Sequence, residues 1–352
     1  MVRQVNRGWR SWFRGGIAMA IAFVILFMVP VPYYIVQPGS ALEVRPMVQM
    51  EDTSNVEKGT FYMTTVSMRE GNVIGYLLAH VDSWMDLVPK EDVLGQGEDP
   101  EHYQYMQEEV MRQSQQNAVL AAFRQAGRPA EERLLGVEVF RVLSGMPAAE
   151  ALKEGDIIQQ VDDHKIGQAE DLLTYLSEKK PGEQVQLLFN RNGDKEETTL
   201  TLASLAASGG EDRPGIGIEP VTLRKVETDP KVSIQADKIG GPSAGLMFSL
   251  EILNQLGDRD LTNGLQVAGT GTISPDGDVG QIGGIQHKIL AAEREHADIF
   301  FVPADVEPQD SNEKKAKATA KELGSDMAIV PVHTLNEAVQ YLDQQRGAQK
   351  TS

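Results

Sequence analysis

The sequence predicts a mixed α/β fold of two domains behind one N-terminal transmembrane helix, on three observations. The length of 352 residues corresponds to about two compact domains. Residues 134–202 hold mainly short strand patterns, whereas strand and amphipathic helix patterns alternate after residue 214. An apolar run without charged residues occupies residues 15–36. The two domains are therefore expected to differ in class, one α/β and one β-rich.

The composition limits the function. The chain carries 33 Lys and Arg against 51 Asp and Glu, and the net charge of -18 repels nucleic-acid phosphates. No nucleic-acid partner is expected. Without cysteine, disulfides, zinc-thiolate sites and a cysteine nucleophile are excluded. The 6 histidines are scattered without a metal-ligand spacing, so neither a metal nor a cofactor is predicted.

The N-terminus has the pattern of a membrane anchor. Residues 1–14 form a basic tail without acids, and residues 15–36 are long enough to cross a bilayer as a helix. The chain is therefore expected to be a single-pass cell-membrane protein with the lipid bilayer as a partner. The positive-inside rule puts the basic tail in the cytoplasm and the rest of the chain outside the membrane. A cleaved signal peptide is the alternative, but the apolar run is longer than signal peptides require.

Residues 37–127 contain strand patterns, such as the alternation from Phe61 to Ser67, and a long polar helix over 101–126. No chemical motif is visible here. The segment either completes the sheet of the last domain around an inserted domain, or forms a module of its own.

Residues 128–205 are predicted to form a separate domain of short strands and helices. The run Leu135-Gly136-Val137 opens it, followed by Gly145-Met-Pro-Ala-Ala and the segment 152–158. In this order the motifs resemble a PDZ domain of the bacterial protease-associated kind. A glycine beside a strand start leaves N–H groups free for a terminal carboxylate, and a strand edge accepts an extended peptide. We therefore expect a peptide site at Leu135, Gly136 and Val137, lined from a helix by Leu172, Leu173 and Leu176; the alternative is that these residues are simply core.

A small, polar linker is expected at 206–214, an α/β domain at 215–346 and a tail at 347–352. Strands are predicted at 232–236, 265–273, 278–282, 299–302 and 327–332. Helices are predicted at 243–256, 285–296 and 311–323, and a final helix is predicted after the last strand, up to about residue 345.

Ser243 follows Gly240-Gly241-Pro242 at the start of an apolar helix. It shares a helical face with Leu246 and Leu250, where an apolar residue is normally expected. The unpaired N–H groups of a helix N-terminus suit a developing oxyanion. Alternatively, the serine is only a helix cap.

Lys288 lies in the predicted helix 285–296, which follows Gly283-Gly284 in the sequence. It is on the same helical face as Ile285, Ile289 and Ala292. Burial disfavours an ammonium ion and lowers the pKa of a lysine. A neutral Lys288 within hydrogen-bond reach of Ser243 would activate the hydroxyl without a histidine.

The blocks GPSAG at 241–245 and GTGTISPDGDVGQIGGIQHKILAAEREHADIFFVP at 269–303 resemble the proteolytic domain of Lon-type serine peptidases. The resemblance implies a Lon-type α/β fold and a catalytic dyad of Ser243 and Lys288. It further implies supporting roles for Thr270, which would orient the lysine, and for Gly241 and Ala244 beside the nucleophile.

With the PDZ-like part and the anchor, the whole chain resembles the membrane-anchored, PDZ-containing Lon-like proteases of Gram-positive bacteria. Lon-like domains often form rings, so a homo-oligomer is a further expectation. One departure is Gly240, where Lon proteins often carry an acid.

A second departure is that no G-x-x-x-x-G-K-[ST] occurs, so the enzyme should be ATP-independent. The expected function is a membrane-anchored serine endopeptidase that cleaves peptides or accessible segments of proteins outside the membrane, with PDZ-assisted selection. The alternative is a catalytically idle PDZ adaptor. A signal-peptidase-like enzyme is disfavoured, because Ser243 lies far from the apolar run in the chain.

Overall fold

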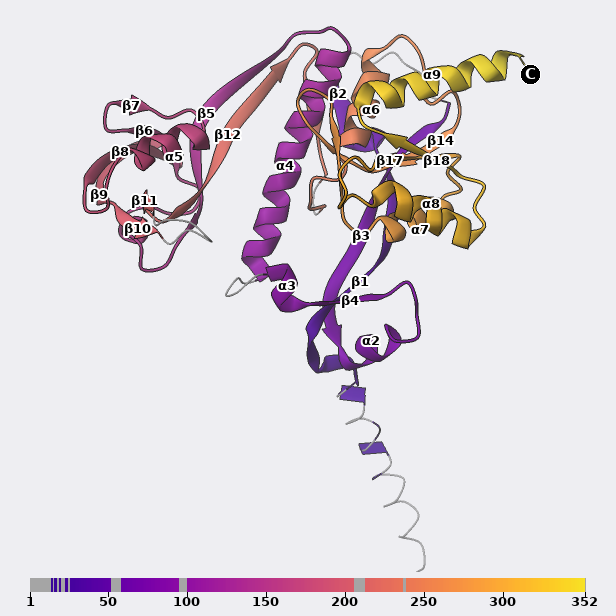
Figure 1. Cartoon of the computed structure of the whole chain (residues 1–352), viewed down its shortest axis with the longest axis horizontal. Helices are drawn as coiled ribbons and strands as arrows, with labels where there is room; N and C mark the ends of the chain where they lie inside the picture. Colours follow the sequence, from indigo (N-terminus) through magenta and orange to yellow (C-terminus); the bar gives the residue numbers. More distant parts are fainter. Residues whose placement is uncertain are drawn as a thin grey trace, which may run out of the picture. The chain divides into compact units, whose positions relative to one another are not determined.

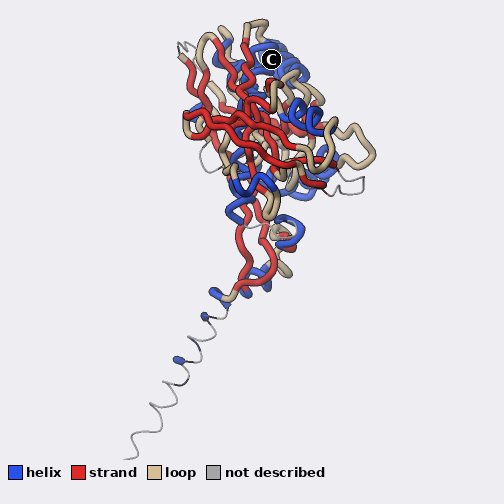
Figure 2. The backbone as a smooth tube through the Cα atoms, turned by 90° about the vertical axis from the view of Figure 1, so that its left-hand side faces the viewer, coloured by secondary structure: helices blue, strands red, loops and turns tan. Residues whose placement is uncertain are grey.

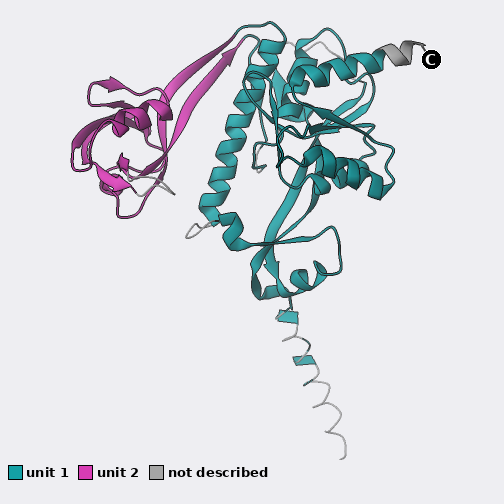
Figure 3. Ribbon diagram, in the orientation of Figure 1, with its two compact units in different colours: residues 1–129, 229–352 teal, residues 130–228 magenta. Residues whose placement is uncertain are grey.

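The computed structural model describes residues 14, 16–17, 19, 23–24, 26–51, 58–94, 100–205, 213–236 and 239–351, with side chains up to residue 346. The chain divides into two compact units (Figure 3). Unit 1 comprises Met1–Pro129 and Asp229–Ser352, and unit 2 comprises Ala130–Thr228. Unit 2 is therefore inserted into the sequence of unit 1.

Unit 1 is built on a six-stranded sheet in the order β18-β17-β14-β3-β1-β4 (Figure 1). The four strands from β18 to β3 run parallel, whereas β1 is antiparallel to both β3 and β4. Figure 2 shows β1 and β3 as two long adjacent strands. The strands are β1 (Pro30–Glu43), β3 (Thr60–Asn72), β4 (Asp86–Pro89), β14 (Gln266–Gly269), β17 (Ile299–Pro303) and β18 (Ala328–Val332).

Helices cover both faces of this sheet, which explains the unbroken apolar run of β17. Phe300 and Val302 share a core cluster with Ile289 of α7. Phe301, on the opposite face, contacts the Tyr341 ring of α9. The main helices are α4 (Pro100–Gln125), α6 (Gly245–Leu256), α7 (Ile285–Arg294), α8 (Asn312–Leu323) and α9 (Leu335–Thr351).

The segment 37–127, whose role the sequence leaves open, contributes strands to this same sheet. β3 pairs with β14, so the first and last parts of the chain form one sheet. The short strand β2 (Val48–Met50) pairs with β13 (Val232–Ile234). The helix predicted over 101–126 is confirmed as α4 and packs against α6.

The expected transmembrane helix over 15–36 is wrong. Within the described part of the chain, no helix is both long and apolar enough to cross a membrane. Pro30–Val36 belong instead to β1, where Ile35 is fully buried between Arg69 of β3 and Leu87 of β4. A buried strand needs the same uncharged apolar run as a membrane helix, so composition alone did not separate the two.

The single-pass cell-membrane localisation rested on that helix and loses its support with it. The basic tail expected at residues 1–14 lies outside the described residues, apart from Arg14, as do residues 15, 18, 20–22 and 25 of the apolar run.

Unit 2 is a sheet in the order β12-β5-β6-β8-β9, with β7 on β6 and the helix α5 (Ala169–Ser177) packed on it. Its core is an apolar cluster that includes Val139, Ile158, Leu172 and Phe189. The strands are β5 (Ala130–Val142), β6 (Ile157–Val161), β7 (His164–Lys165), β8 (Gln184–Arg191), β9 (Asp194–Thr201), β10 (Ala203–Leu205), β11 (Arg213–Gly215) and β12 (Ile218–Thr228).

Three boundaries differ from the predicted ones. β12 pairs with β5 from Ile218 to Thr228, so unit 2 ends at Thr228, whereas the sequence placed its end at 205. In the expected linker, residues 206–212 lie outside the described part and β11 pairs with β10. α9 continues to Thr351 through the expected tail. Pairings between distant segments and a helix continuing through polar residues leave little local signal.

Candidate active site

Ser243 lies in a tight turn that leads into α6. The turn requires Gly241, whose φ of +86° is rarely adopted by other residues. The amide of Gly241 donates to the Gln107 carbonyl of α4 over 2.9 Å. Ala244 is the N-cap residue of α6 and is buried. Among the described residues, the amides of Ser243 and Ala244 have no acceptor, as expected at a helix N-terminus.

Lys288 reaches Ser243 from α7, which begins after Gly284 in the left-handed conformation. The Lys288 side chain is 3% exposed, and its Nζ lies 2.6 Å from Ser243 Oγ. Burial lowers the pKa of Lys288 from 10.5 to about 7. A substantial fraction of this amine is therefore neutral near pH 7 and able to accept a proton.

Thr270 links the two side chains. It follows β14 and is fully buried, with Oγ1 placed 2.9 Å from Lys288 Nζ. The same hydroxyl donates to the Ser243 carbonyl over 3.0 Å, and the Gly271 amide donates to that carbonyl over 2.9 Å. Both the amine and the serine main chain are thereby held in place by one threonine and its neighbour.

Ser243 and Lys288 open into a cleft of about 660 Å³ within unit 1. Lys288 is the one charged residue among the described residues that line it. The other walls are apolar or neutral, and the apolar ones include Val36, Leu42, Val66, Met68, Met111, Ile239 and Ile282. The arrangement therefore places a hydroxyl and a buried amine at one side of an uncharged groove.

The departure at Gly240 has a steric reason. A Cβ atom at this position would lie 2.7 Å from Cβ of Gln107, which α4 packs against the turn. No acidic side chain fits there. His287, the neighbour of Lys288 in sequence, is buried and contacts Asp86 instead of Ser243. Its Nε2 lies 2.9 Å from Asp86 Oδ2.

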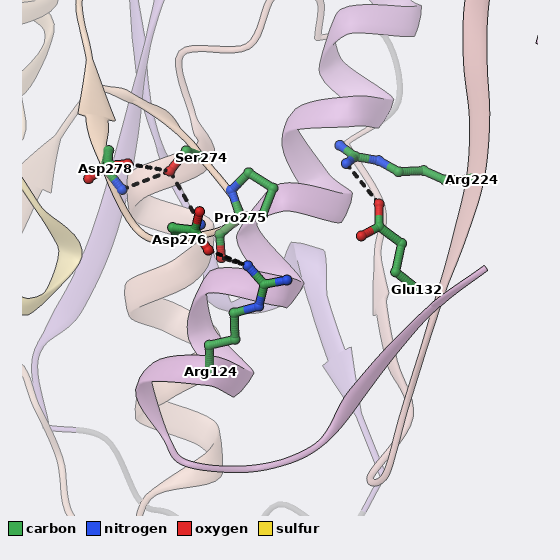
Figure 4. Close-up of polar contacts among 7 residues, drawn as sticks. All are labelled: Arg124, Glu132, Arg224, Ser274, Pro275, Asp276 and Asp278. Carbon is green, nitrogen blue, oxygen red and sulfur yellow. Dashed lines mark hydrogen bonds and ion pairs between the residues drawn. The ribbon is translucent and has the colours of Figure 1, made fainter. Parts of the chain in front are cut away.

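α4 contributes contacts that the sequence did not predict. Ser114 Oγ donates to the Pro242 carbonyl over 2.7 Å, and Asn117 Nδ2 donates to the Ile273 carbonyl over 2.9 Å. Arg124 contacts Pro275 and Asp276 in the turn before β16 (Val279–Gly280) (Figure 4). No local pattern marks these side chains, because their partners lie about 130–150 residues further along the chain.

The expected peptide site at Leu135, Gly136 and Val137 lies in unit 2, in an interior strand. Val137 pairs with Thr222 of β12 on one side and with Ile158 of β6 on the other. Neither edge of the strand is free at this point. The expectation is therefore wrong in its placement, because a strand edge can take up a peptide only where its N–H and C=O groups are unpaired.

β12 is one of the two edge strands of the unit 2 sheet, with β9 at the other edge, and a small groove of about 70 Å³ lies beside β12. Leu172, Leu173 and Leu176 of α5 line it, as expected, opposite the turn 215–218. Gly217 has a φ of +82° and leaves no room for a Cβ against Met146. Among the described residues the amides of Ile216 and Gly217 have no backbone acceptor.

Within the described residues no group of His, Asp and Glu is arranged to hold a metal ion. Residues 215–344 match the family model of the Lon protease (S16) C-terminal proteolytic domain. This part of the chain is similar to the proteolytic domain of Lon-type serine proteases. Residues 108–202 match a PDZ domain model, so this match includes the second half of α4 but not β12.

The curated proteins that the chain is similar to include Lon proteases. The chain is 34% identical over 113 residues to the Lon protease of Metamycoplasma arthritidis, which covers 32% of this chain and 12% of that protein. It is 26% identical over 169 residues to the Lon protease of Vibrio parahaemolyticus, covering 48% of this chain and 20% of the relative. The matches thus span a fifth or less of these relatives.

Among solved structures, the PDZ domain of an SdrC-like protein from Listeria monocytogenes is 30% identical. The match covers 24% of this chain and 87% of the Listeria chain, with a TM-score of 0.23.

Proposed function

We propose that the chain is a serine endopeptidase that hydrolyses peptide bonds through Ser243 and Lys288 without ATP. The observation that carries the proposal is the 2.6 Å distance between Ser243 Oγ and the Nζ of a buried lysine whose pKa lies at about 7. This pairing provides a nucleophile and a base that is partly unprotonated at neutral pH.

In the proposed reaction, neutral Lys288 takes the proton of Ser243 while Oγ attacks the scissile carbonyl carbon. The amides of Ser243 and Ala244 stabilise the oxyanion. Lys288 then returns the proton to the leaving amine, which departs as the acyl-enzyme forms. A water molecule, deprotonated by Lys288, attacks the ester and releases the acid and free Ser243.

The cleft favours an extended peptide with uncharged side chains at the scissile bond. Apart from Lys288, its described walls carry no charge. β4 pairs with β1 only from Tyr33 to Val36, and beyond this point Ser40 and Leu42 of β1 line the cleft. An unpaired strand edge beside the nucleophile supports binding of an unfolded segment by main-chain hydrogen bonds.

Selection of substrates through the PDZ part is the second element of the proposal. The groove beside β12 offers an apolar wall from α5, and the amides of Ile216 and Gly217 have no backbone acceptor within the described part of the chain. Such amides suit a terminal carboxylate, and the apolar wall suits the last side chain of a peptide. Substrates with a free, apolar C-terminus are therefore expected to be cleaved at lower concentrations.

Independence of ATP is part of this proposal, and the 352 residues contain no Walker-type phosphate loop. The substrates would then be peptides or flexible segments that need no unfolding.

The test is cleavage of casein, an unstructured protein, by the full chain without nucleotide. The parent is compared with Ser243→Ala and Lys288→Arg, because a guanidinium cannot act as a base. Lys314→Arg, on the surface of α8, is the matched control. We expect cleavage by the parent and the control only. Cleavage by Ser243→Ala would contradict the proposal, and no cleavage by any variant would favour the adaptor.

A further inference from the structure

Ser114 donates a hydrogen bond to the turn that carries Ser243, and the proposed reaction does not use this bond. Ser114 lies in the middle of α4 and is 3% exposed. Its Oγ donates to the Pro242 carbonyl over 2.7 Å, whereas the other donor to that carbonyl, the Gly245 amide, is 3.4 Å away. The hydroxyl of a distant helix is therefore the principal partner of the carbonyl next to the nucleophile.

This carbonyl belongs to the same planar peptide group as the Ser243 amide. In a trans peptide the C=O and the N–H point in opposite directions, so a bond that fixes the oxygen also fixes the direction of the N–H. A hydrogen bond accepted by the carbonyl also polarises the group and strengthens its N–H as a donor. Among the described residues, the Ser243 N–H has no acceptor.

The peptide group on the other side of Ser243 is held equally firmly. Its carbonyl accepts from Thr270 Oγ1 over 3.0 Å and from the Gly271 amide over 2.9 Å. Ser114 completes this arrangement from α4, whereas the other two donors follow β14. The nucleophile thus lies between two peptide groups whose orientations are set by separate parts of unit 1.

The space around Ser114 suits a small hydroxyl residue. A Cβ atom at Gly245 would lie 2.8 Å from Ser114 Oγ, so α4 and α6 approach closely at this point. Alanine at 114 would keep the packing but leave the Pro242 carbonyl with only the long bond from Gly245.

We propose that Ser114 is a positioning residue that orients the Ser243 amide for the oxyanion. The inference rests on the proposed peptidase function. It assigns to α4, outside the segment matched by the Lon domain model, a part in transition-state stabilisation. Because Ser114 does not touch Lys288, its loss should change the turnover rate without changing the ionisation of the base.

The experiment measures kcat, KM and the pH profile of the full chain with fluorescein-labelled casein, for Ser114→Ala and Ser114→Cys. We expect Ser114→Ala to lower kcat by about 10- to 100-fold with KM within about twofold, since losing one oxyanion donor costs about 100- to 1,000-fold. The pH midpoint should stay unchanged. Cysteine, a weaker donor of similar size, should give an intermediate kcat.

Ser249→Ala is the matched control, because Ser249 is a fully buried serine of α6 that bonds the carbonyl of Gly245 in its own helix. Its kcat should stay within about twofold of the parent. Full kcat in Ser114→Ala, a loss confined to KM, or an equal loss in Ser249→Ala would each overturn the positioning role. An inactive parent would overturn the peptidase proposal and this inference together.

Discussion

Lys288 is a buried lysine whose charged form is disfavoured by desolvation. The lowering of its pKa from 10.5 to about 7 corresponds to a cost of about 5 kcal/mol for the charged form. The contacts with Ser243 and Thr270 hold the amine but do not neutralise a charge. A buried lysine lowers the stability of the fold. Ionisable residues with such strongly shifted pKa values are typical of functional sites.

The pH dependence of cleavage follows directly. Because the neutral amine is the active form, kcat/KM for casein should rise with pH through a midpoint near 7, the pKa of buried Lys288. A profile that falls over the range from pH 6 to 8 would contradict the role of Lys288 as base.

Stability should depend on pH through the same residue. Between pH 7 and 10.5 the unfolded chain binds a proton at Lys288 that the folded chain lacks, so the free energy of unfolding rises with pH in this window. Below pH 7 the buried amine is protonated and the full cost applies. Lys288→Met should therefore be more stable than the parent at pH 6 by a few kcal/mol, with a smaller difference at pH 9. Thermal unfolding at both pH values measures this, and a pH-independent difference would contradict it.

At the scale of elements, α4 connects the nucleophile turn with the β15–β16 turn, where β15 is Thr272–Ile273. It holds the first through Ser114 and the second through Asn117 and Arg124. The ion pair of Arg124 with Asp276 is exposed, so its removal should cost little, typically below about 1 kcal/mol. The hydrogen bonds of buried Ser114 and half-buried Asn117, nearer the middle of the helix, should contribute more to stability.

β12 is the second element with consequences. Its pairing with β5 runs over the full strand and includes the ion pair of Arg224 with Glu132 at 3.1 Å (Figure 4). A fragment 130–205 lacks β12 and leaves the buried Val137 and Val139 on an open edge. We expect it to unfold at a much lower temperature than the fragment 130–228, measured by circular dichroism. Equal melting temperatures would show that β12 is dispensable for unit 2.

At the scale of the molecule, the two halves of unit 1 are one sheet although unit 2 separates them in sequence. β3 pairs with β14, about 200 residues later, and β1 supplies the buried residues Tyr34 and Ile35 between β3 and the edge strand β4. The N-terminal strand is therefore part of the domain that holds the site. Truncation inside it should affect the whole unit.

This predicts a sharp truncation boundary. A fragment beginning at Gln37 loses Pro30–Val36, the part of β1 that pairs with β4, whereas one beginning at Pro30 keeps all of β1. We expect the shorter fragment to unfold at markedly lower denaturant concentration, because burial of an aromatic and an aliphatic side chain is worth several kcal/mol. Equal midpoints for the two fragments would contradict this placement of β1.

Local chemistry made some features predictable. The helices after residue 214 follow from periodicity and glycine positions, and the pairing of Ser243 with Lys288 was implied by the resemblance of two short blocks to Lon-type peptidases. Each of these signals lies within a few residues, where backbone preference and side-chain spacing act directly.

What the sequence by itself determined is the residue types of the site: a serine after flexible glycines, and a lysine in an apolar stripe. The tertiary structure alone decided that residues 30–36 are a strand, that β12 rather than Leu135–Val137 lies at an edge of the unit 2 sheet, and that Ser114 holds the nucleophile turn. Those three depend on contacts between segments far apart in the chain, and a pairing partner at such a distance leaves no trace in the local pattern.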